Sequence, residues 1–230
     1  MHPELFRIGP FAVHTYGVLI ALGLFVSAWG MTALAKKTAF PPADKVLDLL
    51  FVVVVAGFFG ARIFYVIQEG DYYRTHPLEI FKIWEGGLVY FGGVLGSIAG
   101  HYLYVRRARL PYFQACDFVV PFIALTHAFG RIGCFFAGCC YGKNGIPVQL
   151  FESAFNFLLF GFLLWRYLHR RFPGEIFTLY LLGYSAGRFF FEFLRGDQAP
   201  WFFSLTLQQM ISVVFMASGL GLYGICRKRA

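Results

Sequence analysis

The chain has 230 residues, of which 58% are hydrophobic, 20% are aromatic and only 14% are charged. A soluble domain carries about 25% charged residues, so this composition indicates an integral membrane protein and argues against a soluble domain. The formal net charge of +8 would also suit a nucleic-acid-binding protein. The positions of the basic residues decide between these two classes.

Seven apolar segments reach the length of about 20 residues that a membrane span requires. In chain order they cover residues 15–35, 46–67, 86–105, 117–137, 149–168, 175–194 and 205–226. The first is long enough to be a retained span, and we expect no cleavable signal peptide before it. No connecting segment is long enough for a second domain. The sequence therefore predicts an all-α integral membrane protein, a bundle of about seven transmembrane helices forming a single domain over residues 1–230.

Most basic residues follow every second predicted span. They are Lys36 and Lys37, then Arg106, Arg107 and Arg109, then Arg166, Arg170 and Arg171, and finally Arg227, Lys228 and Arg229. Basic residues gather on cytoplasmic loops, so this side is predicted to be cytoplasmic. The N-terminus and the loops 68–85, 138–148 and 195–204 then face outward, and the C-terminus is cytoplasmic. Topology accounts for the net charge, and we expect no nucleic-acid partner.

Four arginines lie within or beside the predicted spans, toward their outward ends: Arg62, Arg131, Arg188 and Arg195. A charge at the bilayer centre costs at least about 2.5–3.5 kcal/mol, so such residues usually face a bundle interior or a water-filled cavity. Each alone would be explained by snorkelling or by a structural ion pair. Four on one side favour a shared anionic ligand.

The sixth span contains a polar stripe in "GYSAGRFFFEFLRGD", residues 183–197. Tyr184, Arg188 and Glu192 are spaced four residues apart and share one helix face, and Arg195 follows three residues after Glu192. An Arg188–Glu192 ion pair that merely helps the helix to insert is the alternative. The two additional polar residues favour a binding site.

Two further motifs begin the first and third spans. "HTYG" places His14 and Tyr16 at the outer interface, where tyrosines are common membrane anchors and where a functional role is also open. In "WEGGLVYFGGVLGSIAG" the spacing of Gly92, Gly96 and Gly100 indicates close helix packing.

Three of the five cysteines lie in "GRIGCFFAGCCYG", residues 130–142. The spacing of Cys134, Cys139 and Cys140 is not that of a standard zinc site, so we expect no metal. A disulfide is plausible in an oxidising compartment, and a reactive thiol or simple packing are alternatives. His127 shares a helix face with Arg131 and Cys134, either as a base or as a buried, hydrogen-bonded histidine.

The ordered set "HTYG", "GARIFYV", "WEGGLVYFGG", "GRIGCFFAGCCYG", "PVQLFES" and "GYSAGRFFFEFLR" resembles the bacterial prolipoprotein diacylglyceryl transferases along nearly the whole chain. The resemblance implies a seven-helix membrane bundle. It also implies transfer of a diacylglyceryl group from phosphatidylglycerol to the lipobox cysteine thiol of a preprolipoprotein, forming a thioether. Matched position by position, the family's functional residues fall on Tyr16, Asp117, Arg131, Gly142, Tyr184, Arg188, Glu192 and Arg195.

The chain departs from the family pattern at several positions. Phe91 stands where the family has a histidine, and Cys134, Ala137 and Cys139 stand where its signature has polar residues. The thiol nucleophile must lose its proton, and the bases left by this sequence are Glu192, His14 and His127. Arginines suit the phosphate leaving group because their planar fork binds phosphate with two hydrogen bonds.

These patterns lead to one predicted site on the outward side of a bacterial cytoplasmic (inner) membrane. The catalytic residues are predicted to be Arg131, Arg188, Glu192, Tyr184 and His127. The substrate-binding residues are predicted to be Tyr16, His14, Arg195, Gly142, Arg62, Cys134 and Cys139. The expected partners are phosphatidylglycerol, membrane lipid and lipobox signal peptides, without a cofactor. The alternative is a non-catalytic or differently specific lipid-binding or thiol-redox membrane protein with the same fold.

Overall fold

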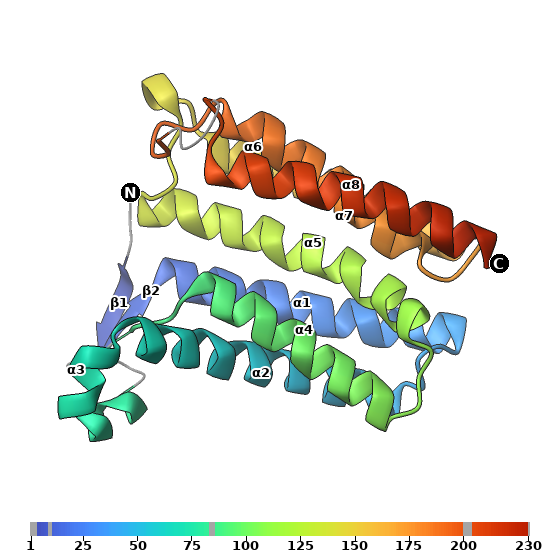
Figure 1. Ribbon diagram of the computed structural model, residues 1–230, viewed down its shortest axis with the longest axis horizontal. Helices are drawn as coiled ribbons and strands as arrows, with labels where there is room; N and C mark the ends of the chain where they lie inside the picture. The colour runs from blue at the N-terminus through green and yellow to red at the C-terminus, as the bar shows by residue number, and fades with distance from the viewer. Residues whose placement is uncertain (1–3, 9–10, 83–85, 200–203, 230) are drawn as a thin grey trace. The chain divides into compact units, whose positions relative to one another are not determined.

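The computed structural model describes residues 4–8, 11–82, 86–199 and 204–229 and is mainly α-helical (Figure 1). Within these residues seven helices have 18 residues or more: α1 Thr15–Thr38, α2 Asp44–Gln68, α4 Tyr90–Arg107, α5 Tyr112–Ala137, α6 Val148–Leu168, α7 Glu175–Glu192 and α8 Leu207–Lys228. Each overlaps one predicted span, and the all-α fold class is confirmed. By length and composition α1, α2, α5, α6 and α8 are candidate membrane spans, whereas α4 and α7 are more polar.

Three short elements complete the described helices. They are α3 Gly70–Thr75 and the 3₁₀ helices η1 Pro77–Phe81 and η3 Lys143–Gly145. A two-stranded antiparallel hairpin, β1 Glu4–Ile8 and β2 Phe11–His14, precedes α1. The hairpin was not predicted, because the sequence was searched for runs long enough to span a membrane.

The chain divides into two compact units, which we describe separately. Unit 1 comprises Met1–Ala33 and Phe113–Ala230, and unit 2 comprises Leu34–Tyr112. The expectation of a single domain over residues 1–230 stays a prediction.

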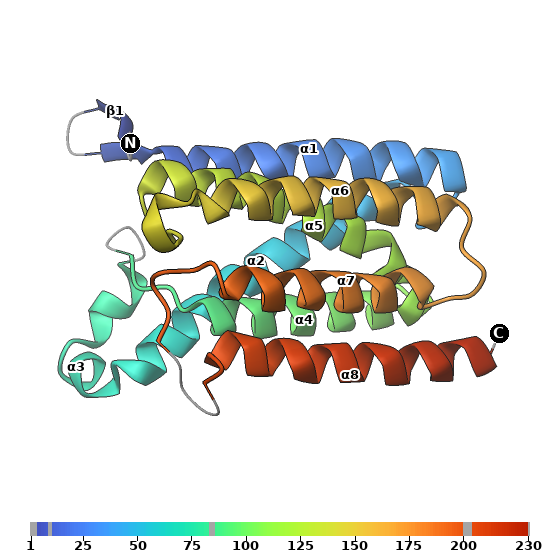
Figure 2. The same cartoon turned by 90° about the horizontal axis from the view of Figure 1, so that it is seen from above.

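In unit 1, α5 is the central helix. Its fully buried face includes Phe118, Ala124 and Ala128. Helix α7 packs against both α6 and α8 (Figure 2). A buried carboxylate fixes the start of α7: Asp117 accepts hydrogen bonds from the backbone N–H groups of Gly174 at 2.7 Å and Phe177 at 2.8 Å. Asp117 therefore satisfies amides that the helix itself leaves without partners, as an N-cap residue does.

In unit 2, α2 and α4 pack closely through glycines. A β-carbon added at Gly60 would lie 2.4 Å from the carbonyl oxygen of Gly92 and 2.9 Å from the α-carbon of Gly96. This geometry confirms the predicted small-residue packing. Helix α4 begins at Tyr90 rather than at residue 86 because Gly86 and Gly87 have φ values of 89° and 74°, outside the helical region.

Gly60→Ala is therefore expected to destabilise the protein by about 1–3 kcal/mol, because the added methyl meets backbone that cannot rotate away. Thermal unfolding in detergent measures this effect. Gly221→Ala is the matched control, since an added β-carbon there has nothing within 4 Å. Equal unfolding temperatures for the two variants would contradict the packing argument.

Candidate functional site

Charged side chains from three helices meet at one end of unit 1. Arg131 lies in the last turns of α5, Glu152 in the second turn of α6 and Arg188 in the last turns of α7. Arg131 Nε lies 2.6 Å from Glu152 Oε2, and Arg188 Nη1 donates to Glu152 Oε1 at 3.0 Å. Both arginines are largely buried and Glu152 is 4% exposed, so the carboxylate joins two guanidinium groups within the bundle.

The network continues along α7 toward α8. Arg188 Nη2 lies 2.8 Å from Glu192 Oε2, and Thr206 Oγ1 donates to Glu192 Oε1 at 2.7 Å. Thr206 is also the N-cap of α8 in a capping box with Gln209. The predicted stripe of α7 therefore faces protein rather than lipid, and its glutamate holds the start of α8.

Arg195 ends the network. Its Nε and Nη2 donate to the two carboxylate oxygens of Asp197 at 2.9 and 2.6 Å, and its Nε lies 3.8 Å from Glu192 Oε2. Burial alone would raise the pKa of Asp197, but this two-bond contact with Arg195 lowers it below its ordinary value. Acids and bases thus alternate from Arg131 to Asp197.

His127 and Tyr184 border the same network, as predicted. Arg131 Nε donates to His127 Nε2 at 3.3 Å, and the rings of His127 and Tyr184 meet edge to face with centroids 5.2 Å apart. Arg131 Nε therefore contacts two groups: it donates a hydrogen bond to His127 Nε2 and forms an ion pair with Glu152 Oε2 at 2.6 Å. A ligand that bound Arg131 in their place would release both groups.

A cavity of about 10 Å³ adjoins these side chains, which is room for about one water molecule. His127, Arg131, Glu152, Tyr184 and Arg188 line it together with Phe155, Asn156 and Phe191. The Asn156 side chain donates to the Glu152 carbonyl oxygen at 2.7 Å, while its own Oδ1 accepts no hydrogen bond from the described residues. A residue with a buried acceptor atom therefore lines the cavity beside the charges.

The sequence analysis missed the contribution of α6. Gln149, Glu152, Ser153 and Asn156 are all buried and recur at three- and four-residue spacing on one face of this helix. The same rule that identified the stripe in residues 184–195 applies to this one. The signal was present in "PVQLFES", which was used only for the family resemblance.

Arg62, predicted to bind substrate, lies in unit 2, and its role in binding stays a prediction. In unit 2 its N–H groups donate to the backbone carbonyls of Glu79, Ile80, Lys82, Gly86 and Gly87, at 2.8 to 3.4 Å. Its guanidinium also contacts the rings of Tyr65 and Tyr73. Arginine has five N–H donors, and these carbonyls use them. Arg62 therefore organises the segment after α3 instead of presenting a free cation.

Of the remaining predicted residues, Tyr16 and Gly142 lie near the end of α5 or in its following loop. Tyr16 packs on Gly133, where an added β-carbon would lie 2.9 Å from the tyrosine ring, while His14 ends β2 with an exposed side chain. Gly142 pairs with Arg195 in an isolated β-bridge, and Lys143 N donates to the Leu194 carbonyl at 2.8 Å. Gly142 thus fixes the backbone that carries Arg195.

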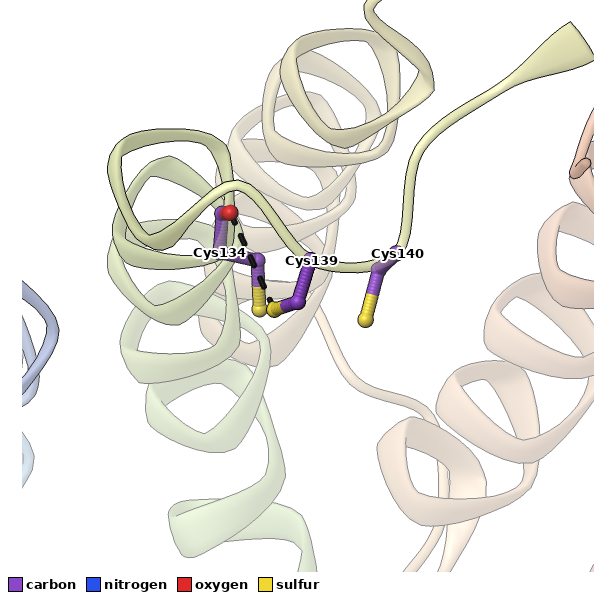
Figure 3. Close-up of side chains that lie close together, drawn as sticks. All are labelled: Cys134, Cys139 and Cys140. Carbon is purple, nitrogen blue, oxygen red and sulfur yellow. Dashed lines mark hydrogen bonds between the residues drawn. The ribbon is translucent and has the colours of Figure 1, made fainter. Parts of the chain in front are cut away.

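Cys134, Cys139 and Cys140 gather at this loop as free thiols (Figure 3). Their sulfur atoms all lie within 4.8 Å of one another, so the disulfide considered above is not formed in this structure. A hydrogen bond from the Cys134 thiol and the charge of Arg195 together lower the pKa of Cys140 to about 5, against the effect of burial. Burial raises the pKa of Cys139. Among the described residues, this cluster has the side chains best suited to hold a metal ion.

Apolar helices that bury alternating arginines and carboxylates at one end define a multi-span membrane protein with a charged network inside its helix bundle. A sequence model described as prolipoprotein diacylglyceryl transferase matches residues 3–225. The chain therefore belongs to the prolipoprotein diacylglyceryl transferase family.

Full-length relatives agree with this assignment. The phosphatidylglycerol–prolipoprotein diacylglyceryl transferase of Clostridium tetani is 33% identical over 100% of this chain and 99% of its own length. The enzyme of the same name from Synechococcus elongatus is 35% identical over 98% of this chain and 89% of its own length. A second transferase of this name from Clostridium perfringens is 32% identical over 93% of this chain and 91% of its own length.

Proposed function

We propose that this chain transfers a diacylglyceryl group from phosphatidylglycerol to the lipobox cysteine thiol of preprolipoproteins, at the charged network of unit 1. The family and the relatives that match along the whole chain support an enzyme of lipoprotein biosynthesis over a non-catalytic lipid-binding or thiol-redox protein. The single observation that most supports this location of the active site is the contact of Arg131 Nε with both Glu152 and His127.

The reaction requires a phosphate to meet buried cations. The thiol sulfur forms a bond to the glycerol carbon that carries the phosphate, the carbon–oxygen bond breaks, and glycerol phosphate leaves with the electron pair. Arg131, Arg188 and Arg195 are balanced in the free protein by Glu152, Glu192 and Asp197. We infer that the lipid phosphate displaces carboxylates from Arg131 and Arg188 and is held by their planar forks, which stabilise charge on the leaving group.

The same displacement supplies a proton acceptor. When the phosphate binds Arg131, Glu152 Oε2 loses its ion-pair partner and His127 Nε2 loses its hydrogen-bond donor, both beside the cavity. Glu152 then accepts the thiol proton, and His127 is the second candidate. Glu192 is less suited to this role, because its Oε1 already accepts the Thr206 hydroxyl and its Oε2, although it accepts no hydrogen bond from the described residues, lies 2.8 Å from Arg188 Nη2 and 3.8 Å from Arg195 Nε.

The free Oδ1 of Asn156 completes the proposed site. Asn156 lines the same cavity as the two arginines, and its buried Oδ1 has no hydrogen-bond partner among the described residues, which is costly. A hydroxyl of the phosphatidylglycerol headgroup would donate to it. This contact would separate phosphatidylglycerol from lipids whose headgroup lacks that hydroxyl.

The proposed membrane orientation places this network at the outer side of a bacterial cytoplasmic membrane. Support comes from unit 1, where Arg166, Arg227 and Lys228 lie in the last turns of α6 and α8, whereas Glu152 and Thr206 lie at the beginnings of these helices. Protease access to a C-terminal tag, compared between spheroplasts and inverted vesicles, tests this orientation. Cleavage in intact spheroplasts would contradict it.

The transfer reaction is tested with purified protein, phosphatidylglycerol vesicles and a synthetic lipobox peptide. We expect a mobility shift and a mass increase equal to one diacylglyceryl group, with release of glycerol phosphate. The control peptide has serine in place of the lipobox cysteine and should not shift. Folded protein that leaves the cysteine peptide unmodified with phosphatidylglycerol, or that modifies it equally well with phosphatidylethanolamine, would overturn the proposed substrate.

A further inference from the structure

The transfer reaction proposed above leaves one cluster of nucleophilic side chains without a function. Cys134 lies in the last turn of α5, and Cys139 and Cys140 lie in the loop that follows. Figure 3 shows the three side chains on neighbouring parts of this turn, with the sulfur atoms of Cys134 and Cys139 side by side. All three sulfur atoms lie within 4.8 Å of one another.

These separations are close to those of a metal–thiolate site. Zinc binds thiolate sulfur at about 2.3 Å, so sulfur atoms that share a tetrahedral or trigonal ion lie about 3.8–4.0 Å apart. The observed separations therefore need only small side-chain rotations to close around one ion. A disulfide would join only two of the sulfur atoms, at about 2.05 Å, and would leave the third unexplained.

The backbone holds the three cysteines in this arrangement. The Cys139 amide donates to the Cys134 carbonyl at 3.2 Å, and Gln149 Nε2 donates to the Cys139 carbonyl at 2.8 Å. Cys140 has φ of 61°, an uncommon conformation for a residue with a side chain. This left-handed turn brings the third sulfur toward the other two, and such outliers concentrate at functional sites.

The surrounding charges suit a thiolate complex. Three thiolates and one divalent ion carry a net charge of −1, and both Arg131 and Arg195 interact electrostatically with Cys140. The thiolate ligands select soft cations such as Zn²⁺, Cd²⁺ and Cu⁺.

We propose that Cys134, Cys139 and Cys140 form a tris-thiolate site for one soft d¹⁰ metal ion, Zn²⁺ or Cu⁺. Binding releases the thiol protons to solvent and leaves the oxidation state of the metal and the sulfur atoms unchanged. Sequence spacing argued against a metal because it compared the motif with standard zinc fingers, whereas the turn after α5 folds the three residues together. A bound ion would join the loop that pairs with Arg195 to the end of α5.

Metal binding is tested on reduced, chelator-treated protein in detergent, independently of transfer activity. We expect Zn²⁺ and Cd²⁺ each to bind with a stoichiometry of one per chain, and Co²⁺ to give the near-ultraviolet charge-transfer absorption of thiolate ligands. Cys134→Ala, Cys139→Ala and Cys140→Ala should each abolish this absorption and stoichiometric binding. Cys116→Ala and Cys226→Ala are the matched controls, because these buried thiols lie outside the cluster, and they should retain both.

Three results would overturn the metal site. The first is stoichiometric metal binding that survives all three cluster substitutions. The second is absence of metal binding by folded, reduced protein. The third is protein isolated without reductant whose mass and alkylation pattern show a disulfide within the cluster and no metal. Because these measurements need no lipid or peptide, their failure is distinguishable from failure of the proposed transferase function.

Discussion

Arg131→Gln is expected to lower the rate of diacylglyceryl transfer by about 10²–10³-fold, the usual cost of removing one preorganised group that stabilises a developing negative charge. The variant loses the guanidinium that contacts both Glu152 and His127, so the lipid phosphate loses one of its cations. The measurement is the initial rate of the peptide mobility shift at saturating phosphatidylglycerol.

Arg166→Gln is the matched control for this change. Arg166 also pairs with a buried glutamate between α6 and α7, Glu175, but at the opposite ends of the two helices. Each substitution removes a largely buried guanidinium that pairs with a glutamate of a neighbouring helix. Both variants should therefore have lower thermal stability. Only Arg131→Gln should lower the transfer rate of the folded protein. Equal rates for the two variants would rule out a specific role for Arg131.

Glu152→Gln is expected to have the largest effect on stability. It removes the carboxylate between Arg131 and Arg188, so Arg131 loses its ion-pair partner and Arg188 keeps only Glu192. Breaking a buried ion pair by removing one partner costs about 3–5 kcal/mol. We therefore expect a marked fall in the unfolding temperature in detergent. The transfer rate should also be lost, because Glu152 is the proposed proton acceptor.

Two comparisons separate these effects. Glu175→Gln breaks the Arg166–Glu175 contact and should lower stability without abolishing transfer. In a double-mutant cycle, Arg131→Gln should cost less stability when Glu152 is already glutamine, with a coupling of about 0.5–3 kcal/mol. Strict additivity of the two substitutions would show that the 2.6 Å contact between these side chains is not energetically coupled.

The sequence predicted the long helices well because membrane spans are long and apolar, and their polar interruptions are rare. It singled out Arg131, Arg188 and Glu192, which the structure brings into one ion-pair network, because charges in apolar segments are conspicuous. Glu152 was overlooked because it begins its span, where a polar residue is ordinary. The ion-pair partner of each charged residue depends on which helices pack together. The periodicity of a single helix carries no information about that packing.

Arg62 and the three clustered cysteines show that side-chain contacts made by loops could not be predicted from the sequence. For Arg62 the sequence pattern suggested a ligand-binding role, and for the cysteines it suggested no metal site. Arg62 fitted the pattern of an outward arginine, yet backbone carbonyls that follow α3 take its donors. Cys134, Cys139 and Cys140 fitted no standard ligand spacing, yet a turn with a left-handed residue gathers their sulfur atoms. In both cases a loop conformation decided the result, and loop conformations leave little periodic signal.

Helix α7 is attached at both ends to other helices of unit 1. Asp117 of α5 holds its first amides, and Glu192 near its end holds the Thr206 hydroxyl before α8. A shift of α7 along its axis by one residue, about 1.5 Å, would break both attachments at once. These contacts therefore fix the position of α7 along its axis relative to α5 and the start of α8. Arg188 lies between these two attachments, so its backbone keeps a fixed position along the axis relative to Asp117 of α5 and Thr206 at the start of α8.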